Sequence, residues 1–436
     1  MSQVDGVKQS GIDWIGDVPR GWDLVRGRFL FSSRKELNHN LRCTNLLSLT
    51  LFGVLNKEFD SNDGLRPASY EGYQLFEADD LVFKLIDLEN VKTSRVGIVH
   101  EPGIMSPVYI RFTPNHKSLY PKYAYWFYYD LYKKEIYNVL GSGVRSSLSA
   151  SDLAEIVLPI PPLDEQRLIA RYLDKKTQQI DTLIEKIEKK IELLKEQRTS
   201  LINHYVTKGL DPNVEMKDSG VEWIGKIPKH WSRVRIKHLV STKVTDGPHE
   251  TPTFHDSGVP FLSVEGIVGN TIDLNHVRGY ISNEDHEIYS RKCKPKKYDV
   301  LLVKSGSTTG KSAIVEVDID FNIWSPLCIL RGNDSLISPY FFFQSIQSNY
   351  FLTQVQTSWS FGTQPNIGMG VIENLWVILP SKKEQEEILR YLHKSLSVTD
   401  DLQRSHEVKI SLLKEYRQSL ISSVVTGKVR VTEDMV

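Results

Sequence analysis

The chain has 436 residues, of which 40% are hydrophobic and 25% charged, so it resembles an ordinary globular protein of two to four domains. It contains no apolar run long enough for a membrane span and no N-terminal secretory signal, and we expect a cytoplasmic protein without membrane contact. The formal net charge is zero, which argues against a protein that grips DNA alone and favours a subunit whose partners share phosphate contacts.

The N-terminal motif Ser10–Trp22 returns as Ser219–Trp231, with two tryptophans eight residues apart in each copy. Further matches recur at a similar distance, including Glu165-Gln166 with Glu384-Gln385. A period of about 210 to 220 residues is far too long for a solenoid. It indicates a duplicated domain whose two copies pack about a pseudo-twofold axis, as the subunits of a homodimer do.

The first body, residues 1–155, contains short β-branched and aromatic runs that predict strands, such as Gly97–Val99 and Val108–Phe112. A helix with an aromatic face is predicted over residues 123–132, shortly after a proline that suits a first helical turn. Its aromatic side chains fit a protein core better than a platform for stacking nucleic-acid bases.

A long helix is predicted within residues 156–209, because positions 163–205 contain neither Gly nor Pro. Apolar residues recur there every seven positions, which is typical of a coiled-coil seam, and at 1.5 Å per residue the rod would be about 63 Å long. The seam residues are Leu173, Ile180, Ile187, Leu194 and Leu201.

The second body, residues 210–375, has a predicted strand at Val300–Val303 and a predicted aromatic helix over residues 340–351. The second long helix, over about 384–424 within residues 376–436, repeats the heptads with a more polar middle at Thr399, Gln403 and His406. We expect the two long helices to pair antiparallel within one chain; the alternative is that each packs only on its own body. The expected fold is therefore α+β, with two similar mixed α/β bodies separated by an antiparallel coiled coil.

The sequence contains no complete catalytic motif that we recognise. Gly306–Ser312 resembles a phosphate-binding P-loop, but it has three residues between the glycines where the motif needs four. Ile160–Leu163 lacks the outer residues of a methyltransferase loop, and no zinc spacing, nucleophile elbow or nuclease arrangement is apparent. The three cysteines are too few and scattered for a disulfide framework or a thiolate metal site. We predict no catalytic residue, metal site or cofactor in this chain.

Candidate DNA contacts come from polar loops at related places in the two bodies. Gln and Asn amides can pair with adenine, Arg can read guanine, and Lys, Ser and Thr can bind phosphate or base edges. Solvated loops without a ligand are the alternative for each position taken alone. The candidates are Lys92, Ser94, Arg95, Arg145, Ser146 and Ser147 in the first body, and His249, Thr251, Lys304, Ser307, Thr308, Lys311, Gln364 and Asn366 in the second.

Along its whole length the chain resembles the specificity subunits of type I restriction-modification systems. The resemblance rests on the paired openings at Ser10 and Ser219, the turn Asp246–Pro252 and the helix entry Pro159–Gln166. The second helix entry, Leu379–Gln385, departs from the pattern because it lacks the double proline and is two residues shorter.

The resemblance implies two target recognition domains that each read half of a split double-stranded DNA site. The long helices would set the spacer between the half-sites and dock two modification subunits, which would bind S-adenosylmethionine and methylate adenine. A motor-nuclease restriction subunit would complete the complex. The competing hypotheses are a fused methyltransferase or nuclease, and a free-standing coiled-coil scaffold or DNA-binding regulator.

Overall fold

The computed structural model describes residues 6–57, 69–86, 88, 94–141, 147–359 and 365–436. The chain divides into two compact units. Unit 1 comprises Met1–Ile187 and Glu407–Val436, and unit 2 comprises Glu188–His406. Each unit therefore contains one of the predicted bodies, the beginning of one long helix and the end of the other.

Unit 1 is built around a four-stranded antiparallel sheet with the strand order β4-β11-β8-β9. Its strands are β4 (Phe31–Ser32), β8 (Leu81–Phe83), β9 (Val96–Ile98) and β11 (Ile110–Pro114). Helix α2 (Pro121–Lys133) packs against β9, and it begins at a proline because that position has no intrahelical partner to lose. The predicted aromatic face of this helix is in the core, where Tyr123, Phe127 and Tyr128 are fully buried.

The other strands of unit 1 form two-stranded pairs. The pairs are β1 (Val7–Gln9) with β2 (Asp17–Pro19), β3 (Asp23–Arg26) with β12 (Val157–Ile160), β5 (Leu47–Thr50) with β6 (Gly53–Asn56), and β7 (Gln74–Phe76) with β10 (Gly103–Met105). Three short helices complete the unit: α1 (Gly27–Leu30), α3 (Ile136–Leu140) and α4 (Ala150–Glu155).

Unit 2 repeats the central sheet, in the equivalent order β16-β24-β21-β22. Its strands are β16 (Thr245–Asp246), β21 (Val300–Val303), β22 (Ser312–Ile314) and β24 (Leu327–Leu330). The single aromatic helix expected over residues 340–351 is instead two helices, α7 (Pro339–Ile346) and α8 (Asn349–Thr357). The break occurs because Ser348 has an extended backbone and its hydroxyl donates to the Ser345 carbonyl.

Unit 2 also contains a three-stranded sheet, with β17 (Val259–Leu262) between β20 (Gly279–Ile281) and β23 (Asn322–Ile323). The remaining strand pairs are β13 (Met216–Asp218) with β14 (Lys226–Pro228), β15 (Ser232–Arg235) with β25 (Trp376–Leu379), and β18 (Ile267–Val268) with β19 (Thr271–Ile272). Helices α6 (Asn283–Ser290) and α9 (Met369–Ile372) complete the unit.

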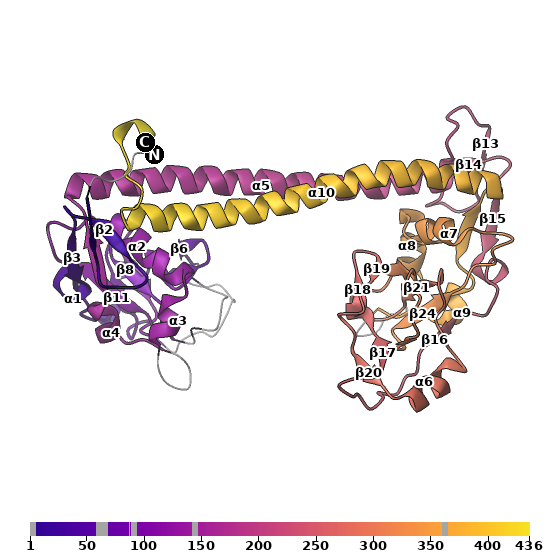
Figure 1. Ribbon diagram of the computed structural model, residues 1–436, viewed down its shortest axis with the longest axis horizontal. Helices are drawn as coiled ribbons and strands as arrows, with labels where there is room; N and C mark the ends of the chain where they lie inside the picture. The colour runs from indigo at the N-terminus through magenta and orange to yellow at the C-terminus, as the bar shows by residue number, and fades with distance from the viewer. Residues whose placement is uncertain (1–5, 58–68, 87, 89–93, 142–146, 360–364) are drawn as a thin grey trace. The chain divides into compact units, whose positions relative to one another are not determined.

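The two long helices are α5 (Leu163–Lys208) and α10 (Lys382–Val425), and both lie within their predicted ranges. In each unit a segment of α5 and a segment of α10 lie side by side and run in opposite directions (Figure 1). Arg198 forms an ion pair with Asp400 at 3.3 Å in unit 2. Two turns further along α5, the hydroxyl of Tyr205 forms a hydrogen bond with that of Tyr391. Positions thus rise on α5 as they fall on α10, which confirms the antiparallel pairing.

Equivalent contacts repeat 219 residues apart, as expected for a duplication. In unit 1, Arg417 forms an ion pair with Asp181 at 2.9 Å, which corresponds to Arg198 with Asp400 in unit 2. Gln166 accepts from the Tyr120 amide and donates to the Ser118 and Pro161 carbonyls. Its counterpart in unit 2 makes the same three bonds, with Ser338, Leu336 and Pro380.

The departure at the second helix entry has a local explanation. Where the first entry has two prolines, Ser381 caps α10: its hydroxyl accepts from the Glu384 amide at 3.3 Å, and Glu384 accepts from the Ser381 amide at 3.1 Å. This reciprocal pair is a capping box, which satisfies two amides that a helix start leaves without partners. The α10 entry therefore keeps its helix start with Ser381 in place of the second proline.

Candidate nucleic-acid interface

A buried carboxylate organises the polar surface of unit 2. Asp246, at the end of β16, has no exposed surface and is surrounded by three basic side chains. Its two oxygens lie 2.7 Å from Nζ of Lys292, 3.2 Å from Nζ of Lys304 and 3.1 Å from Nε2 of His249. Burial alone would raise the pKa of Asp246, but the hydrogen bonds and charges of the two lysines outweigh it and lower this pKa.

Backbone packing makes this arrangement specific to glycine at position 247. A Cβ added at Gly247 would lie 1.7 Å from the Ile323 carbonyl oxygen, so any other residue would displace β23. The close approach turns the chain out of β16 toward the exposed residues His249 and Thr251. The motif Asp246–Pro252 is therefore a tight exit from a buried strand that carries basic and hydroxyl groups to the surface.

The loop between β21 and β22 lies beside the segment that contains Asn366. The Gly306 amide donates to the Pro365 carbonyl at 3.0 Å, and Ser305 and Asn366 form an isolated β-bridge. Ser307, Lys311 and Asn366 are exposed, whereas Thr308 is half-buried. The structure thus brings together two predicted sites that are about 60 residues apart in sequence.

Lys304 connects this loop to the carboxylate. Only 8% of the residue is exposed, its ammonium binds Asp246, and its carbonyl accepts from the Ile367 amide at 2.9 Å. The prediction that this side chain faces DNA does not match its buried position, which instead gives it a structural role that fixes the loop. Of the three basic side chains around Asp246, those of His249 and Lys292 are exposed.

The basic run over residues 291–297 is partly engaged in ion pairs. Lys294 binds Asp320 at 2.9 Å, and Lys292 binds Asp246 while 53% of its side chain stays exposed. Arg291, Lys296 and Lys297 are exposed in the same segment. Such a group of cations next to hydroxyl and amide side chains can contact phosphates and base edges together.

In unit 1 the predicted sites are less accessible. Ser94 and Arg95 are buried at 3% and 2% exposure, and they bond to main-chain carbonyls, including those of Val96 and Ile86. Neither side chain reaches the surface, so the expectation that they face DNA does not match their position. Ser147 is half-buried. Lys92, Arg145, Ser146 and, in unit 2, Gln364 lie outside the described residues.

Two residues of the cluster, Asp246 and Lys292, were missing from the sequence-based set. Asp246 opens the Gly-Pro turn, and Lys292 lies in the basic run. Their pairing joins positions 46 residues apart, so no local pattern reveals it. The one sequence signal was an acid at the end of a β-branched run, directly before Gly-Pro.

Among the described residues, no helix is long and apolar enough to cross a membrane. No group of three or more His, Cys, Asp or Glu side chains in the described part of the chain could hold a metal ion. The loop that resembled a P-loop is the β21–β22 connection, with its glycines at positions 306 and 310 in left-handed conformations.

A comparison with known families decides the assignment. The family model for the type I restriction modification DNA specificity domain matches residues 56–193 and 228–411, one match in each half. The chain belongs to this family. The two matches confirm the resemblance inferred from the paired openings and helix entries.

Among characterised relatives, the chain is similar to the type I restriction enzyme EcoBI specificity subunit of Escherichia coli, with 27% identity over 289 residues. That match covers 64% of this chain and 60% of the relative. The MjaIX specificity subunit of Methanocaldococcus jannaschii is 22% identical over 432 residues, which is 96% of this chain and 88% of the relative.

Solved structures show the same fold. One chain, from work on complex assembly and conformational transition of the type I R-M system, matches with a TM-score of 0.71 and 15% identity. The match covers 94% of this chain and 99% of that chain. The HsdS subunit from Thermoanaerobacter tengcongensis matches with a TM-score of 0.51 and 15% identity, over 94% and 98% of the two chains. The predicted α+β fold with two long helices is therefore confirmed.

Proposed function

We propose that the chain is the non-catalytic, sequence-reading subunit of a type I restriction-modification complex. In this proposal each unit contains one target recognition domain, and each domain reads one half of a bipartite DNA site. The proposal is supported by the observation that the two units share the same internal structure but differ in their polar surfaces. The central sheets, helix entries and ion pairs repeat in both units, whereas the cluster around Asp246 has no counterpart in the described residues of unit 1.

DNA reading in unit 2 is assigned to the exposed groups beside the buried carboxylate. Lys292 and Lys311 supply cations for phosphate, His249 supplies an imidazole that can form hydrogen bonds, and Asn366 supplies an amide suited to adenine. The buried Lys304 and Asp246 hold these exposed groups in place. This division of roles is consistent with their burial and with the bonds that connect the loop to β16.

The helices are proposed to dock two modification subunits. Each unit exposes one leucine from α5 and one from α10, between 38% and 58% accessible, and these leucines are equivalent. Leu183 and Leu412 belong to unit 1, whereas Leu402 and Leu193, each 219 residues away from its counterpart, belong to unit 2. Two like apolar surfaces on a duplicated frame favour two like partners. The partners would hold S-adenosylmethionine and extrude the target adenine for methylation.

The test is co-expression with candidate modification subunits, followed by genome-wide mapping of methylated adenine. A split motif that appears only when this chain is present would support the proposal and reveal both half-sites. A stable complex without new methylation would favour the second candidate, a coiled-coil scaffold or DNA-binding regulator without a restriction partner.

The enzyme alternative is tested separately on the isolated chain. A fused methyltransferase or nuclease would bind S-adenosylmethionine or a divalent cation by itself, and calorimetric titration would detect the heat. The proposed subunit shows neither binding event, and its own DNA binding is weak, salt-sensitive and poorly selective.

A further inference from the structure

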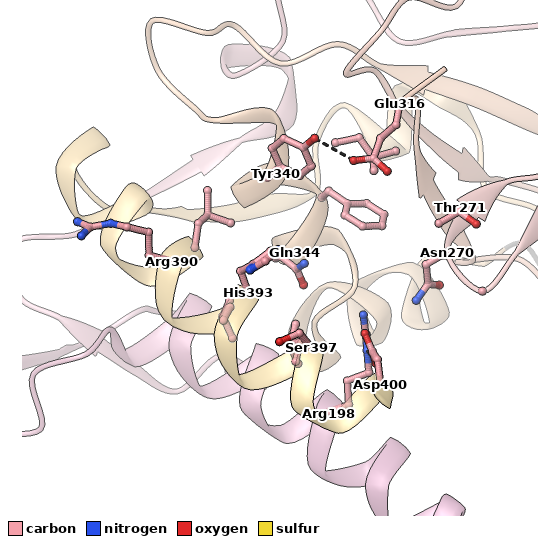
Figure 2. Close-up of a pocket in the computed structure, with 16 residues that line it drawn as sticks. Arg198, Asn270, Thr271, Glu316, Tyr340, Gln344, Arg390, His393, Ser397 and Asp400 are labelled. Carbon is pink, nitrogen blue, oxygen red and sulfur yellow. Dashed lines mark hydrogen bonds and ion pairs between the residues drawn. The ribbon is translucent and has the colours of Figure 1, made fainter. Parts of the chain in front are cut away.

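Unit 2 contains a cavity of about 650 Å³ between α7, β22, the β18–β19 hairpin and the first half of α10. Figure 2 shows Gln344 of α7 extending toward the α10 turn that carries His393 and Ser397, with Asn270 and Thr271 across the cavity. The apolar part of its wall is formed by Ile314, Phe343, Leu389, Leu392 and Leu396. A cavity of this size, with an apolar wall and a few polar groups, has the character of a binding pocket.

In unit 1 the chain's own aromatic residues occupy the corresponding place. Trp126 lies six residues after the anchored amide of Tyr120, as Gln344 lies six residues after Ser338. Asp174 lies eight residues after Gln166, as His393 lies eight after Gln385. The Trp126 indole donates to Asp174 at 3.1 Å and so spans the space between α2 and α5.

Two neighbouring tyrosines complete this filling. The rings of Tyr125 and Tyr129 pack on Trp126 with centroid distances of 5.2 and 5.6 Å. Arg417 of α10 donates to the Tyr129 hydroxyl at 3.2 Å. In unit 2 the residue equivalent to Tyr129 is Gln347, which accepts from Arg198 at 3.5 Å. Unit 2 therefore keeps this polar contact and, with Phe343 at the place of Tyr125, one ring, but it lacks the rings of Trp126 and Tyr129.

Gln344, which lines the cavity, has a side-chain acceptor without a hydrogen-bond donor in the described part of the chain. Its Oε1 atom is buried and has no hydrogen-bond partner among the described residues. A buried acceptor without a donor is unfavourable, so its burial favours a ligand that brings a donor to it. The indole of Trp126 shows which chemistry suits this position, because it fills the space between the helices and donates an N–H.

We propose that this cavity binds an aromatic side chain with an N–H or O–H group, a tryptophan or tyrosine, which a partner protein inserts. The ring lies against Phe343, Leu392 and Leu396, and its donor bonds to Oε1 of Gln344. Tyr391 and Val398, which neighbour the lining positions on α10, are exposed and extend the apolar surface outside the cavity for the rest of the partner segment. The inference concerns unit 2 alone and does not depend on which DNA sequence is read.

The test uses the full chain with N-acetyl-tryptophanamide as probe and saturation-transfer NMR as readout. The wild type is expected to bind one equivalent of the probe saturably and N-acetyl-leucinamide at least tenfold more weakly. Gln344→Trp fills the cavity and is expected to weaken probe binding at least tenfold. Glu386→Trp, at an exposed position of α10 outside the cavity, is the matched control and keeps wild-type binding.

The mirrored variant Trp126→Gln opens the corresponding space in unit 1 and is expected to raise the stoichiometry from one probe to two. The Gln344→Trp result decides the matter even where Trp126→Gln fails to fold. Absence of saturable binding, equal binding by Gln344→Trp, or equal binding of the leucine probe overturns the proposal. Much tighter binding of free indole than of N-acetyl-tryptophanamide also overturns it, because the pocket would then exclude a peptide-borne side chain.

Discussion

The indole Nε1 of Trp231 donates a hydrogen bond of 2.9 Å to Oε1 of Glu384, which joins the second tryptophan motif to the first turn of α10. Burial alone would raise the pKa of Glu384, but hydrogen bonds from Trp231, His230 and Ser381 lower it to about 2. Trp22 makes the equivalent bond to Glu165 at 3.2 Å, yet burial dominates there and raises the pKa of Glu165. The tryptophan bond lowers the carboxyl pKa in both units, but only Glu384 has the further bonds from His230 and Ser381 that outweigh its burial.

Glu384→Gln is expected to destabilise unit 2 at neutral pH by up to about 2 kcal/mol. The folded-state pKa lies below the ordinary value of 4.5, so the stabilisation is present above pH 4.5 and is lost as the pH falls toward 2. Segment-resolved hydrogen exchange at several pH values measures this. Glu165→Gln is the control, and it should leave unit 1 unchanged or more stable at pH 7. A Glu384→Gln effect of constant size across this pH range would contradict the assignment.

Lys304 and Lys292 bind the same carboxylate but should contribute very differently to stability. Lys304→Met removes a buried partner of Asp246 and is expected to reduce the free energy of unfolding of unit 2 by about 2 to 4 kcal/mol. Lys292→Ala removes a half-exposed partner and should cost less than about 1 kcal/mol. Denaturant unfolding of the two variants provides the comparison, and equal losses would refute the structural role of Lys304.

Lys292, whose replacement should have little effect on stability, should contribute to DNA binding. Lys292→Ala is expected to weaken DNA binding about equally for all sequences and to reduce its salt dependence by about one phosphate contact. Asn366→Ala is expected to relax the preference at one base position instead. Salt-dependent binding of the assembled complex distinguishes the two effects. A change of preferred base with Lys292→Ala would show that it reads sequence.

Replacing the exposed leucines should remove partners one at a time. Leu183→Asp with Leu412→Asp is expected to leave a complex with one modification subunit in place of two, and Leu193→Asp with Leu402→Asp should do the same. Native mass spectrometry counts the subunits directly. Glu188→Asp, a conservative change at an exposed position of α5, serves as the control. Two bound partners in both double variants would exclude this docking surface.

Lengthening the long helices should change only the unread spacer. A seven-residue insertion between Lys189 and Leu194, with a matching insertion in α10, keeps the heptad register and adds about 10 Å of helix. The methylated motif is then expected to gain up to about three base pairs between unchanged half-sites. Altered half-site letters would count against a modular protein.

Exchanging residues 1–155 for the corresponding body of a relative should alter one half-site and leave the other intact. Methylation mapping of the chimera measures both halves at once. Exchanging residues 210–375 is the reciprocal control and should alter the opposite half. A chimera that changes both half-sites would show that the units do not read DNA independently.

The duplication and the long helices could be predicted because their signals are local and periodic. The heptads through Leu173, Ile180 and Ile187 predicted a seam, and these residues are buried. Ser348, by contrast, ends α7 without a Gly or Pro signal, so one helix was expected where two exist. Periodicity reveals a buried face, but a break made by one hydroxyl bond to the main chain leaves no comparable pattern.

The candidate site was predictable only as a set of loops. Ser94, Arg95 and Lys304 have residue types that suit DNA contact, yet their burial depends on partners elsewhere in the chain. The pairing of Lys304 with Asp246 joins positions 58 residues apart, and a sequence does not record which of several nearby cations turns inward. Composition locates polar loops, whereas tertiary packing decides which of their side chains face solvent.

The division of the chain into units also constrains the order in which the two units can be completed during synthesis. Unit 2 is one continuous segment, but unit 1 requires residues 407–436, which are synthesised after all of unit 2. Gly427 packs against Pro19 and Trp22 in a left-handed conformation that only glycine adopts readily, so the final residues complete the first core. Domains usually fold in the order in which they are made. Here the body that is translated first is completed only after the second one, and until then the apolar seam of its α5 segment lacks its α10 partner.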